Sequence, residues 1–367
     1  MSSPPATLDR RALNRATLAR QHLLERSPLD ACGMVEHLVG LQGQAPSPPY
    51  TGLWTRVAGF RGEDLSGLVE SRDVVRITLM RGTVHVASAR DALLLRPLTE
   101  PAYQAAVARG YREHLAGVDL DALSARVREL VEERPRTPAE LVAELGAVWP
   151  GRPSQALTNA ANAWTPLVQT PPRGLWKRGG LPRLTTLESW VGRPVAASPS
   201  IDDVVLRFLG AFGPASVRDV QKWCGLTRLG AVLDRLRPRL VTFRDAAGAE
   251  LFDLPDAPRP GGDATAPVRF LPEFDNVLLS YAGYDRVMAP EQKPALFTVN
   301  GRILGSVLVD GFVAASWRTD TLRQAVTLTV TPLVTLGARA RREVAAEGER
   351  LLSFLADDAP ARSVVVG

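Results

Sequence analysis

Apolar residues past the middle of the chain recur first at helical and then at strand spacing. Residues 201–212 (IDDVVLRFLGAF) place apolar side chains three to four positions apart, which predicts an amphipathic helix. A second helix is expected between a capping Ser216 and a terminating Gly225, and a third from Thr227. Two apolar-rich strands around a turn at 245–248 complete the pattern. Three short helices followed by a hairpin are the elements of a winged helix-turn-helix.

The same order of elements recurs upstream. A helical stretch at 119–133 precedes helices that start at Thr137 and at a capping Ser154, and two strands follow, the second of them around LWKR, joined by a Pro-rich turn at 171–174. A weaker third copy nearer the N-terminus comprises a helix at 13–25, a helix opened by Pro28, a Pro-rich break, a helix near 51–57 and strands within 74–88. Recurring architecture without obvious sequence identity indicates tandem modules.

The pattern changes to strands after a Pro/Gly-rich linker at 256–267. Asn300-Gly301 and Asp310-Gly311 stand between apolar alternations, and such pairs are typical of two-residue hairpin turns. A helical stretch at 342–356 follows, so this part of the chain is expected to be a β-rich domain closed by a helix.

These patterns predict an α+β fold of tandem winged helix-turn-helix modules with a β-rich C-terminal domain. Several units also agree with the length of 367 residues, since a typical domain has roughly 150. The expected units are a first winged-helix-like module at 8–117, a second winged helix at 118–196, a third at 197–257, and a β-rich domain with a terminal helix at 268–367.

Composition and motifs remove several classes of protein. No stretch reaches the roughly 18 consecutive apolar residues of a membrane span, and the N-terminus lacks the apolar core of a secretory signal, so a cytoplasmic location and no membrane partner are expected. The two cysteines and four histidines show no zinc spacing, and no phosphate-binding loop, dinucleotide fingerprint or G-x-S-x-G elbow occurs. We therefore expect no metal and no cofactor.

Positive charge is concentrated in two stretches. Residues 152–183 carry five basic side chains and no acidic one, and residues 214–244 carry seven basic side chains against Asp219 and Asp234. Local excess of this kind favours a polyanionic partner. Because both stretches fall in the expected winged helices, we expect them to bind nucleic acid, although winged helices also serve as protein-interaction modules.

Two glutamines in a proline-rich loop are the main candidates for chemistry. The segment GLQGQAPSPPY (40–50) cannot continue a helix because of its prolines, and Ala45 before Pro46 favours an extended backbone. In an extended segment Gln42 and Gln44 project to the same side, so two carboxamides could face one cavity. The alternative is that both glutamines lie in a solvated loop and have no catalytic role.

Four segments in order resemble one known family. GLQGQAPSPPYTGLWTR, LMRGTVH, LPEFDNVLLSYAGYDR and NGRILGSVLVDGFVAASW together are similar to the AlkZ/YcaQ superfamily of winged-helix DNA glycosylases. The resemblance implies a C-shaped molecule that removes bulky alkylated bases from double-stranded DNA, with Gln42 and Gln44 as the catalytic Gln-x-Gln motif of the AlkZ-like branch. The family usually has an apolar residue between the glutamines, where this chain has Gly43. Several members resemble self-resistance proteins of antibiotic producers.

The amide chemistry suits an activated leaving group. A glutamine cannot act as a strong base, but its oxygen accepts and its NH2 donates hydrogen bonds, so the pair could orient water toward C1′ and stabilise oxocarbenium charge. Such assistance suffices for a cationic N7- or N3-alkylated purine, including one in an interstrand crosslink. No lysine lies near the loop in sequence, so a monofunctional glycosylase without lyase activity is expected. Bulky adducts further suggest an open channel, with the turn at Asn300 or Asp310 probing a groove.

Other residues receive supporting roles. Arg81 and His85 are candidates for contact with a phosphate or the active channel, and Asp275 and Asn276 for fixing a turn. Candidate contacts to the DNA backbone are Lys177, Arg178, Lys222, Arg228 and Arg302.

Two other functions remain open at this point. A transcription regulator would use the same helices to read an operator, usually as a dimer. No heptad or dimerisation helix is present, so we expect a monomer located at the nucleoid. A protein that sequesters a genotoxic drug is the third possibility.

Overall fold

The N-terminal part of the computed structural model is mainly helical, and the structure describes residues 5–367. Its elements are α1 (Arg10–Arg20), α2 (Ala31–His37), β1 (Leu41–Gln42), α3 (Pro48–Trp54), α4 (Gly62–Glu70), β2 (Val74–Thr78), the 3-10 turn η1 (Met80–Gly82), β3 (Val84–Ser88) and α5 (Ala89–Gly110). The Asp30 side chain caps α2 by accepting from Gly33 N. The expected start of this helix at Pro28 was therefore two to three residues early.

The next stretch contains three helices and a split hairpin. Its elements are α6 (Leu120–Glu133), α7 (Pro138–Val148), α8 (Ser154–Trp164), β4 (Leu167–Thr170), β5 (Arg183–Thr186) and α9 (Leu187–Val191). Thr137 and Glu140 form a capping box on α7, which confirms the predicted start. Ser154 does not cap α8, because Pro153 occupies the cap position. The second strand was also misplaced: it starts at Arg183, and the LWKR segment lies in the long β4–β5 connection.

Three helices and a hairpin follow in the predicted order. They are α10 (Ile201–Phe212), α11 (Val217–Cys224), α12 (Gly230–Leu236), the 3-10 turn η2 (Arg237–Arg239), β6 (Val241–Arg244) and β7 (Glu250–Asp253). Ser216 caps α11 and Gly225 ends it with φ 78°, as predicted. The expected start of α12 at Thr227 was wrong, because Leu229 N donates to the Gln221 side chain and the helix begins only at Gly230.

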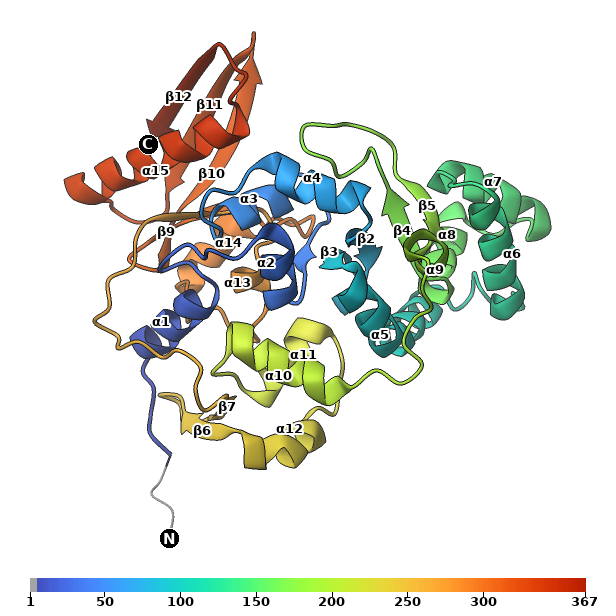
Figure 1. The fold of residues 1–367 in the computed structure, drawn as a ribbon, viewed down its shortest axis with the longest axis horizontal. Helices are drawn as coiled ribbons and strands as arrows, with labels where there is room; N and C mark the ends of the chain where they lie inside the picture. The colour runs from blue at the N-terminus through green and yellow to red at the C-terminus, as the bar shows by residue number, and fades with distance from the viewer. Residues whose placement is uncertain (1–4) are drawn as a thin grey trace.

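One sheet joins strands from the first two expected modules. Its strand order is β1-β3-β2-β4-β5, and β2 pairs with β4 at Arg76 opposite Gln169. The boundary expected at 117/118 thus falls between β3 and β4 in the sequence, although both strands belong to this one sheet. Figure 1 shows this sheet at the centre, with α6, α7 and α8 beyond β4 and β5.

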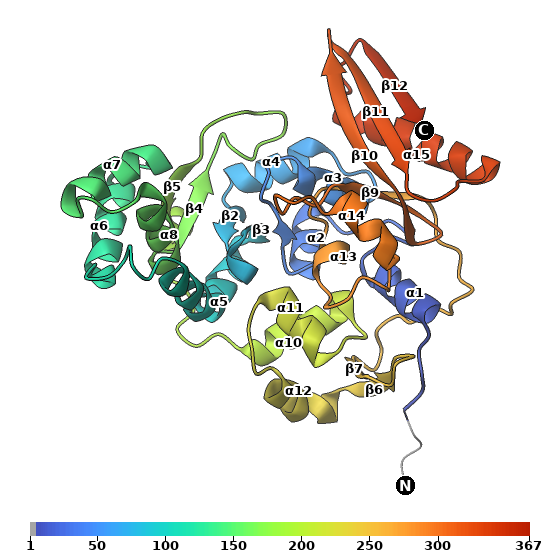
Figure 2. The ribbon, with the colours of Figure 1, turned by 180° about the vertical axis from the view of Figure 1, so that it is seen from behind.

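The C-terminal part is a second five-stranded sheet with a long helix. Its elements are β8 (Arg269–Leu271), α13 (Asn276–Leu279), η3 (Pro290–Gln292), α14 (Lys293–Leu296), β9 (Gly305–Val309), β10 (Phe312–Leu322), β11 (Ala325–Pro332), α15 (Ala338–Leu355) and β12 (Ala361–Val366). The strand order is β12-β11-β10-β9-β8, and apolar residues of α15 pack on the sheet. Figures 1 and 2 both show β10 and β11 extending away from the rest of the molecule.

The two Gly turns of this part have different surroundings. The Asp310-Gly311 turn joins β9 to β10 as predicted, with φ 47° and 80°. A Cβ at Gly311 would lie 2.5 Å from Asn14, because the turn packs against α1. Asp310 also forms ion pairs with Arg11 and Arg15 of α1, so this turn is held against α1. The Asn300-Gly301 turn is exposed.

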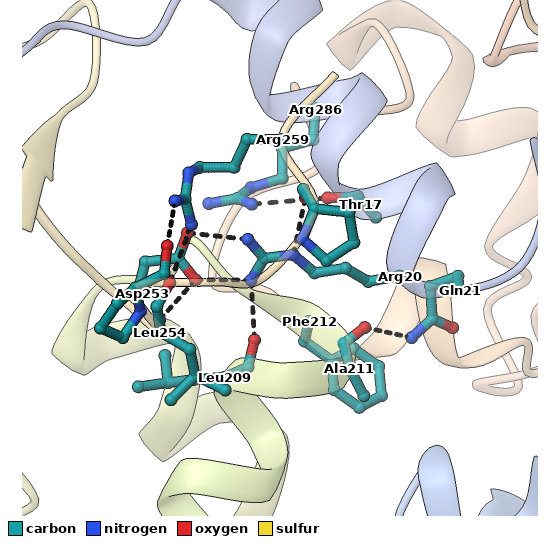
Figure 3. A network of polar contacts seen from close by, with 12 residues as sticks. Thr17, Arg20, Gln21, Leu209, Ala211, Phe212, Asp253, Leu254, Arg259 and Arg286 are labelled. Atoms are coloured by element: carbon teal, nitrogen blue, oxygen red, sulfur yellow. Dashed lines mark hydrogen bonds and ion pairs between the residues drawn. The ribbon is translucent and has the colours of Figure 1, made fainter. Parts of the chain in front are cut away.

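A buried ion pair joins helix α1 to strand β7. Arg20 donates from both terminal nitrogens to Asp253, at 2.5 and 2.7 Å, and both side chains are buried (Figure 3). Arg259 pairs with the same carboxylate at 2.7 Å, and Gln21 donates to the Ala211 carbonyl at 2.6 Å. These contacts join chain segments that are about two hundred residues apart into one polar network.

Within residues 5–367, no helix is long and apolar enough to cross a membrane. The same residues contain no group of three or more His, Cys, Asp or Glu side chains that could hold a metal ion.

Candidate active site

The glutamine loop is the junction between β1 and α3. Gln42 ends β1 and lies opposite His85 of β3, while Gln44 follows in the bent connection that leads to α3. Gln42 is only 7% exposed, whereas Gln44 is exposed. Two residues that are alike in chemistry therefore have different access to solvent.

Arg81 fixes the side chain of Gln42. Its Nη2 donates to Gln42 Oε1 at 2.9 Å, and its Nη1 donates to the Trp223 carbonyl at the end of α11. Arg81 itself lies in η1 with φ 57°. Burial lowers the pKa of the Arg81 guanidinium to about 10, so it remains charged at neutral pH. Both terminal nitrogens of Arg81 thus bond to protein atoms, and the amide nitrogen of Gln42 has no partner among residues 5–367.

Gln44 lies at the edge of a polar recess. Its Oε1 accepts a long hydrogen bond, 3.4 Å, from Val84 N. The recess has a volume of about 240 Å³, and its polar lining includes Arg76, Asn159 and Gln169. Gln42 is not part of this lining, so only one of the two amides faces the recess.

Gly43 gives the loop its close contact with the sheet. Gly43 N donates to Val84 O at 2.7 Å, and its carbonyl accepts from Arg76 Nη2 at 2.7 Å. A Cβ at position 43 would stand 3.1 Å from Arg76 Nη1 and 3.1 Å from Val86. Glycine at this position thus leaves room for the Arg76 guanidinium, which bonds the Gly43 carbonyl, while Val84 bonds the Gly43 N–H.

Arg76 is a site residue that the sequence analysis missed. It is fully buried in β2, and burial, with the nearby Arg173, lowers the pKa of its guanidinium to about 10. Its Nη1 has no hydrogen-bond partner in the described part of the chain. A charged residue inside the apolar strand VVRIT was the available signal, because an arginine there must be buried with a partner.

The LPEFDN segment supports the loop from behind. Asn276 Nδ2 donates to the Gly40 carbonyl at 2.9 Å, two residues before Gln42. Asp275 caps α13 and accepts from both terminal nitrogens of Arg56 at 2.8 and 2.9 Å, and both side chains are fully buried. The expected turn-fixing residues therefore also connect the C-terminal part to the glutamine loop. Arg56, their partner, was missed.

His85 is enclosed and uncharged. Its Nδ1 donates to the Thr83 carbonyl at 2.8 Å, and the residue is 2% exposed. Burial, and secondarily the charge of Arg81, lower the pKa of His85 to about 3. The ring is not placed to bind a phosphate.

The candidate DNA-backbone residues fall into two groups. Lys177 pairs with Asp357 and Asp358, and Arg302 pairs with Glu273 at 2.6 Å. The other three candidates, Arg178, Lys222 and Arg228, are exposed and form no ion pair among residues 5–367. The first group is already neutralised by carboxylates, so only the second offers free positive charge.

A larger cavity of about 930 Å³ lies on the other side of the glutamine loop. It is lined by residues 45–48 of the loop, by 175–179 of the β4–β5 connection and by the C-terminal sheet. Trp176 in that connection stacks on Phe354 of α15 with ring centroids 4.7 Å apart. The glutamine loop thus separates a small polar recess from a wide cavity.

Comparison with known proteins shows the family to which the chain belongs. The family model "DNA glycosylase AlkZ-like" matches residues 35–354. An "Interstrand DNA cross-link repair glycosylase" from Streptomyces sahachiroi is 26% identical over 333 residues, which cover 82% of this chain and 85% of that protein. The solved structure of Streptomyces sahachiroi DNA glycosylase AlkZ superposes with a TM-score of 0.79 at 21% identity, covering 98% of this chain and all of that one. Since the family model spans most of the sequence, including the glutamine loop and LPEFDN, the chain belongs to the AlkZ-like DNA glycosylase family.

Proposed function

We propose that this protein is a monofunctional glycosylase that releases bulky, cationic N7- or N3-alkylated purines from double-stranded DNA. The observation that carries the proposal is the pair Gln42 and Gln44, held on a loop whose backbone is bonded by Arg76 and Asn276. The interstrand crosslink named for the relative from Streptomyces sahachiroi suggests that crosslinked purines are also substrates. Self-resistance to a genotoxic natural product is the proposed biological role.

The proposed reaction divides the work between the two amides. The C1′–N bond breaks, its electron pair neutralises the alkylated purine, and a water oxygen bonds to C1′ while its proton leaves to solvent. The free amide nitrogen of Gln42 positions this water, and the exposed amide of Gln44 stabilises charge that develops at the sugar. Because an amide is a weak catalyst, the proposal requires a leaving group that is already positively charged.

The product is expected to be an abasic site without strand cleavage. A Schiff base needs an accessible amine, and the lysine nearest the loop in sequence, Lys177, pairs with two aspartates. The proposal also treats the three helix–hairpin stretches as winged helices of a C-shaped monomer, which binds the DNA backbone through Arg178, Lys222 and Arg228 and acts at the nucleoid in the cytoplasm.

Base release from defined duplexes tests the proposal. Wild-type protein should release the base from a duplex with one N7-alkylguanine, whereas Gln42→Ala and Gln44→Ala should lower the single-turnover rate by about 100-fold or more, as for loss of a preorganised polar group. The matched control is Gln155→Ala, an exposed glutamine of α8. Urea unfolding checks that all variants fold. Undiminished release by both glutamine variants would refute the mechanism, and sequence-dependent binding of undamaged DNA without release would favour a regulator.

A further inference from the structure

The cavity of about 930 Å³ lies directly beside the glutamine loop. One of its walls is formed by residues 45–48, so the cavity begins at the residue that follows Gln44. The β4–β5 connection and the β10–β11 hairpin form other walls, and Figures 1 and 2 show these two segments on either side of α3. Sites for drug-sized ligands have volumes of about 300–1,000 Å³. The cavity therefore has room for a bulky group next to the catalytic loop.

Part of the cavity lining is aromatic. Tyr50, Trp176 and Trp317 all contribute to it. Trp176 is held between neighbouring rings, since it stacks on Phe354 and its ring centroid lies 4.9 Å from that of Tyr50. Trp317 is fixed by a hydrogen bond from its Nε1 to the Leu271 carbonyl at 2.7 Å. Rings that are already fixed offer apolar surface to a ligand with little further loss of side-chain entropy.

The β10–β11 hairpin adds a polar side to the cavity. In its register Ser316 lies opposite Thr331 and Arg318 lies opposite Thr329, so these four side chains point to one face of the hairpin. All four line the cavity, while the other face of the hairpin packs against α15. Three of the four are neutral hydroxyl residues. This side of the cavity thus suits a group that is polar in places but uncharged.

The charges along the cavity are largely compensated within the protein. Three of the four lining cations form ion pairs, namely Lys177 with Asp357 and Asp358, Arg302 with Glu273, and Arg318 with Asp320. Arg178 is the lining cation without an ion pair among residues 5–367. Because DNA phosphates bind through free cations, this lining offers the DNA backbone a single partner. A neutral ligand does not depend on such partners.

We infer that this cavity holds the bulky substituent of the damaged purine, and that the substituent it accepts is neutral and carries an aromatic ring system. The inference rests on the proposed function, because that mechanism places the sugar of the alkylated nucleotide at Gln42 and Gln44. A substituent on the attached purine then extends past the loop, where the cavity begins one residue after Gln44. The identity of the purine plays no part in this inference.

The inferred site predicts that a large neutral substituent increases activity. Wild-type protein should release N7-(2-naphthylmethyl)guanine from duplex DNA with a kcat/KM about 10-fold higher than that for N7-methylguanine, because burial of apolar rings is favourable. Each rate is first divided by the rate of spontaneous base loss from the same duplex. The gain should be smaller for N7-(6-aminomethyl-2-naphthylmethyl)guanine, because its ammonium group would lose water without finding a free carboxylate in the lining.

A substitution that fills the cavity tests the inference. Thr331→Trp adds an indole on the cavity face of β11, and the exposed position in a strand should tolerate it. It should lower kcat/KM for the naphthylmethyl adduct by about 10-fold and change that for N7-methylguanine much less. The matched control is Ser363→Trp, which adds the same group at an exposed position of β12 outside the cavity lining and should behave as wild type. Urea unfolding midpoints check that both variants fold.

The outcomes separate this inference from the proposed function. Selective loss of the naphthylmethyl gain in Thr331→Trp supports the substituent site. An undiminished gain in that variant, or equal gains for the neutral and the ammonium substituent, would overturn it. Equal losses for both adducts, together with weaker binding of an undamaged duplex, would overturn it as well, since the cavity would then hold the DNA backbone. Absence of release from every alkylated duplex by wild type would overturn the proposed function itself, whereas release without a naphthylmethyl gain would overturn the substituent site alone.

Discussion

Gln42 and Gln44 are two residues apart in the chain, yet the first side chain is buried and the second is exposed to solvent. Gln42 is buried, and its oxygen is engaged by the charged Arg81. Gln44 is exposed beside a recess, and its oxygen has only a 3.4 Å bond. The structure thus gives the inner glutamine a fixed side chain and the outer one access to solvent. Under the proposed mechanism this difference corresponds to two roles, with Gln42 positioning water and Gln44 contacting the substrate.

The inner side of the loop depends on buried arginines from separate segments. Arg56 is paired with Asp275, Arg76 with the Gly43 carbonyl, and Arg81 with Gln42. A buried charge is costly unless it is paired or hydrogen-bonded, so these contacts restrict where each guanidinium can lie. We expect this requirement to keep the inner side rigid, in contrast with the outer side.

Loss of the ion pair between Arg56 and Asp275, behind the glutamine loop, should have the largest effect on stability. Arg56→Ala leaves the Asp275 carboxylate buried without a partner, and it should lower the free energy of unfolding by about 3–5 kcal/mol. Urea unfolding measures the loss. Arg339→Ala, which breaks the exposed pair with Glu343, should change the free energy of unfolding very little. Equal effects of the two substitutions would show that the buried side is no more constrained than the surface.

Removing the contact between Arg81 and Gln42 should affect the reaction more than DNA binding. Arg81→Ala frees the amide of Gln42, and loss of a charged hydrogen bond worth about 1.5–3 kcal/mol predicts a rate of base release lower by roughly 10- to 100-fold. Because Arg81 contacts Gln42 and Trp223, KM for the duplex should stay close to that of wild type. Steady-state and single-turnover kinetics separate the two quantities. A raised KM that depends on salt, with unchanged kcat, would instead indicate a phosphate contact.

Buried histidines should make the fold sensitive to acid. The pKa of His85 is lowered to about 3 and that of His22 to about 4, in each case mainly by burial. Between pH 6.5 and 5 the unfolded chain binds protons at these residues and the folded chain does not. The free energy of unfolding should therefore fall as pH decreases, by up to about 1.4 kcal/mol per pH unit for each histidine.

Urea unfolding at several pH values checks this sign. His85→Gln should flatten the dependence between pH 6.5 and 5, where most carboxylates remain ionised. A dependence as steep as that of wild type would show that His85 takes up a proton in the folded protein. His85 should also contribute no step to the pH profile of base release above pH 5, because the folded protein keeps it neutral there.

Local features of the sequence predicted local structure well. Ser216 and Thr137 cap their helices, Gly225 ends α11, and Asp310-Gly311 forms the predicted turn. Each outcome depends on side chains within a few residues, so spacing alone was sufficient. Thr227 failed as a helix start because the Gln221 side chain bonds Leu229 N and delays α12.

Contacts between distant segments could not be predicted from spacing. The bond between Asn276 and Gly40 joins residues 236 positions apart, and the pair of Arg56 with Asp275 joins residues 219 apart. The motifs identified Gln42 and Gln44, but the recess appears only when β2, β4 and α8 meet.

The smallest expected effect is on the salt dependence of DNA binding, and it concerns two exposed lysines that differ in their ion pairs. Lys222 has no ion pair among residues 5–367, whereas Lys177 is held by Asp357 and Asp358. A lysine that neutralises a phosphate adds about 0.9 to the slope of log K against log salt. Lys222→Ala should reduce the slope for an undamaged duplex by about that amount, and Lys177→Ala, its matched control, should leave it nearly unchanged. Fluorescence anisotropy between about 50 and 200 mM salt measures both slopes. If Lys177→Ala lowered the slope as much as Lys222→Ala, the aspartates would have to release Lys177 when DNA binds. An ion pair in the free protein would then not distinguish the lysines that contact DNA from those that do not.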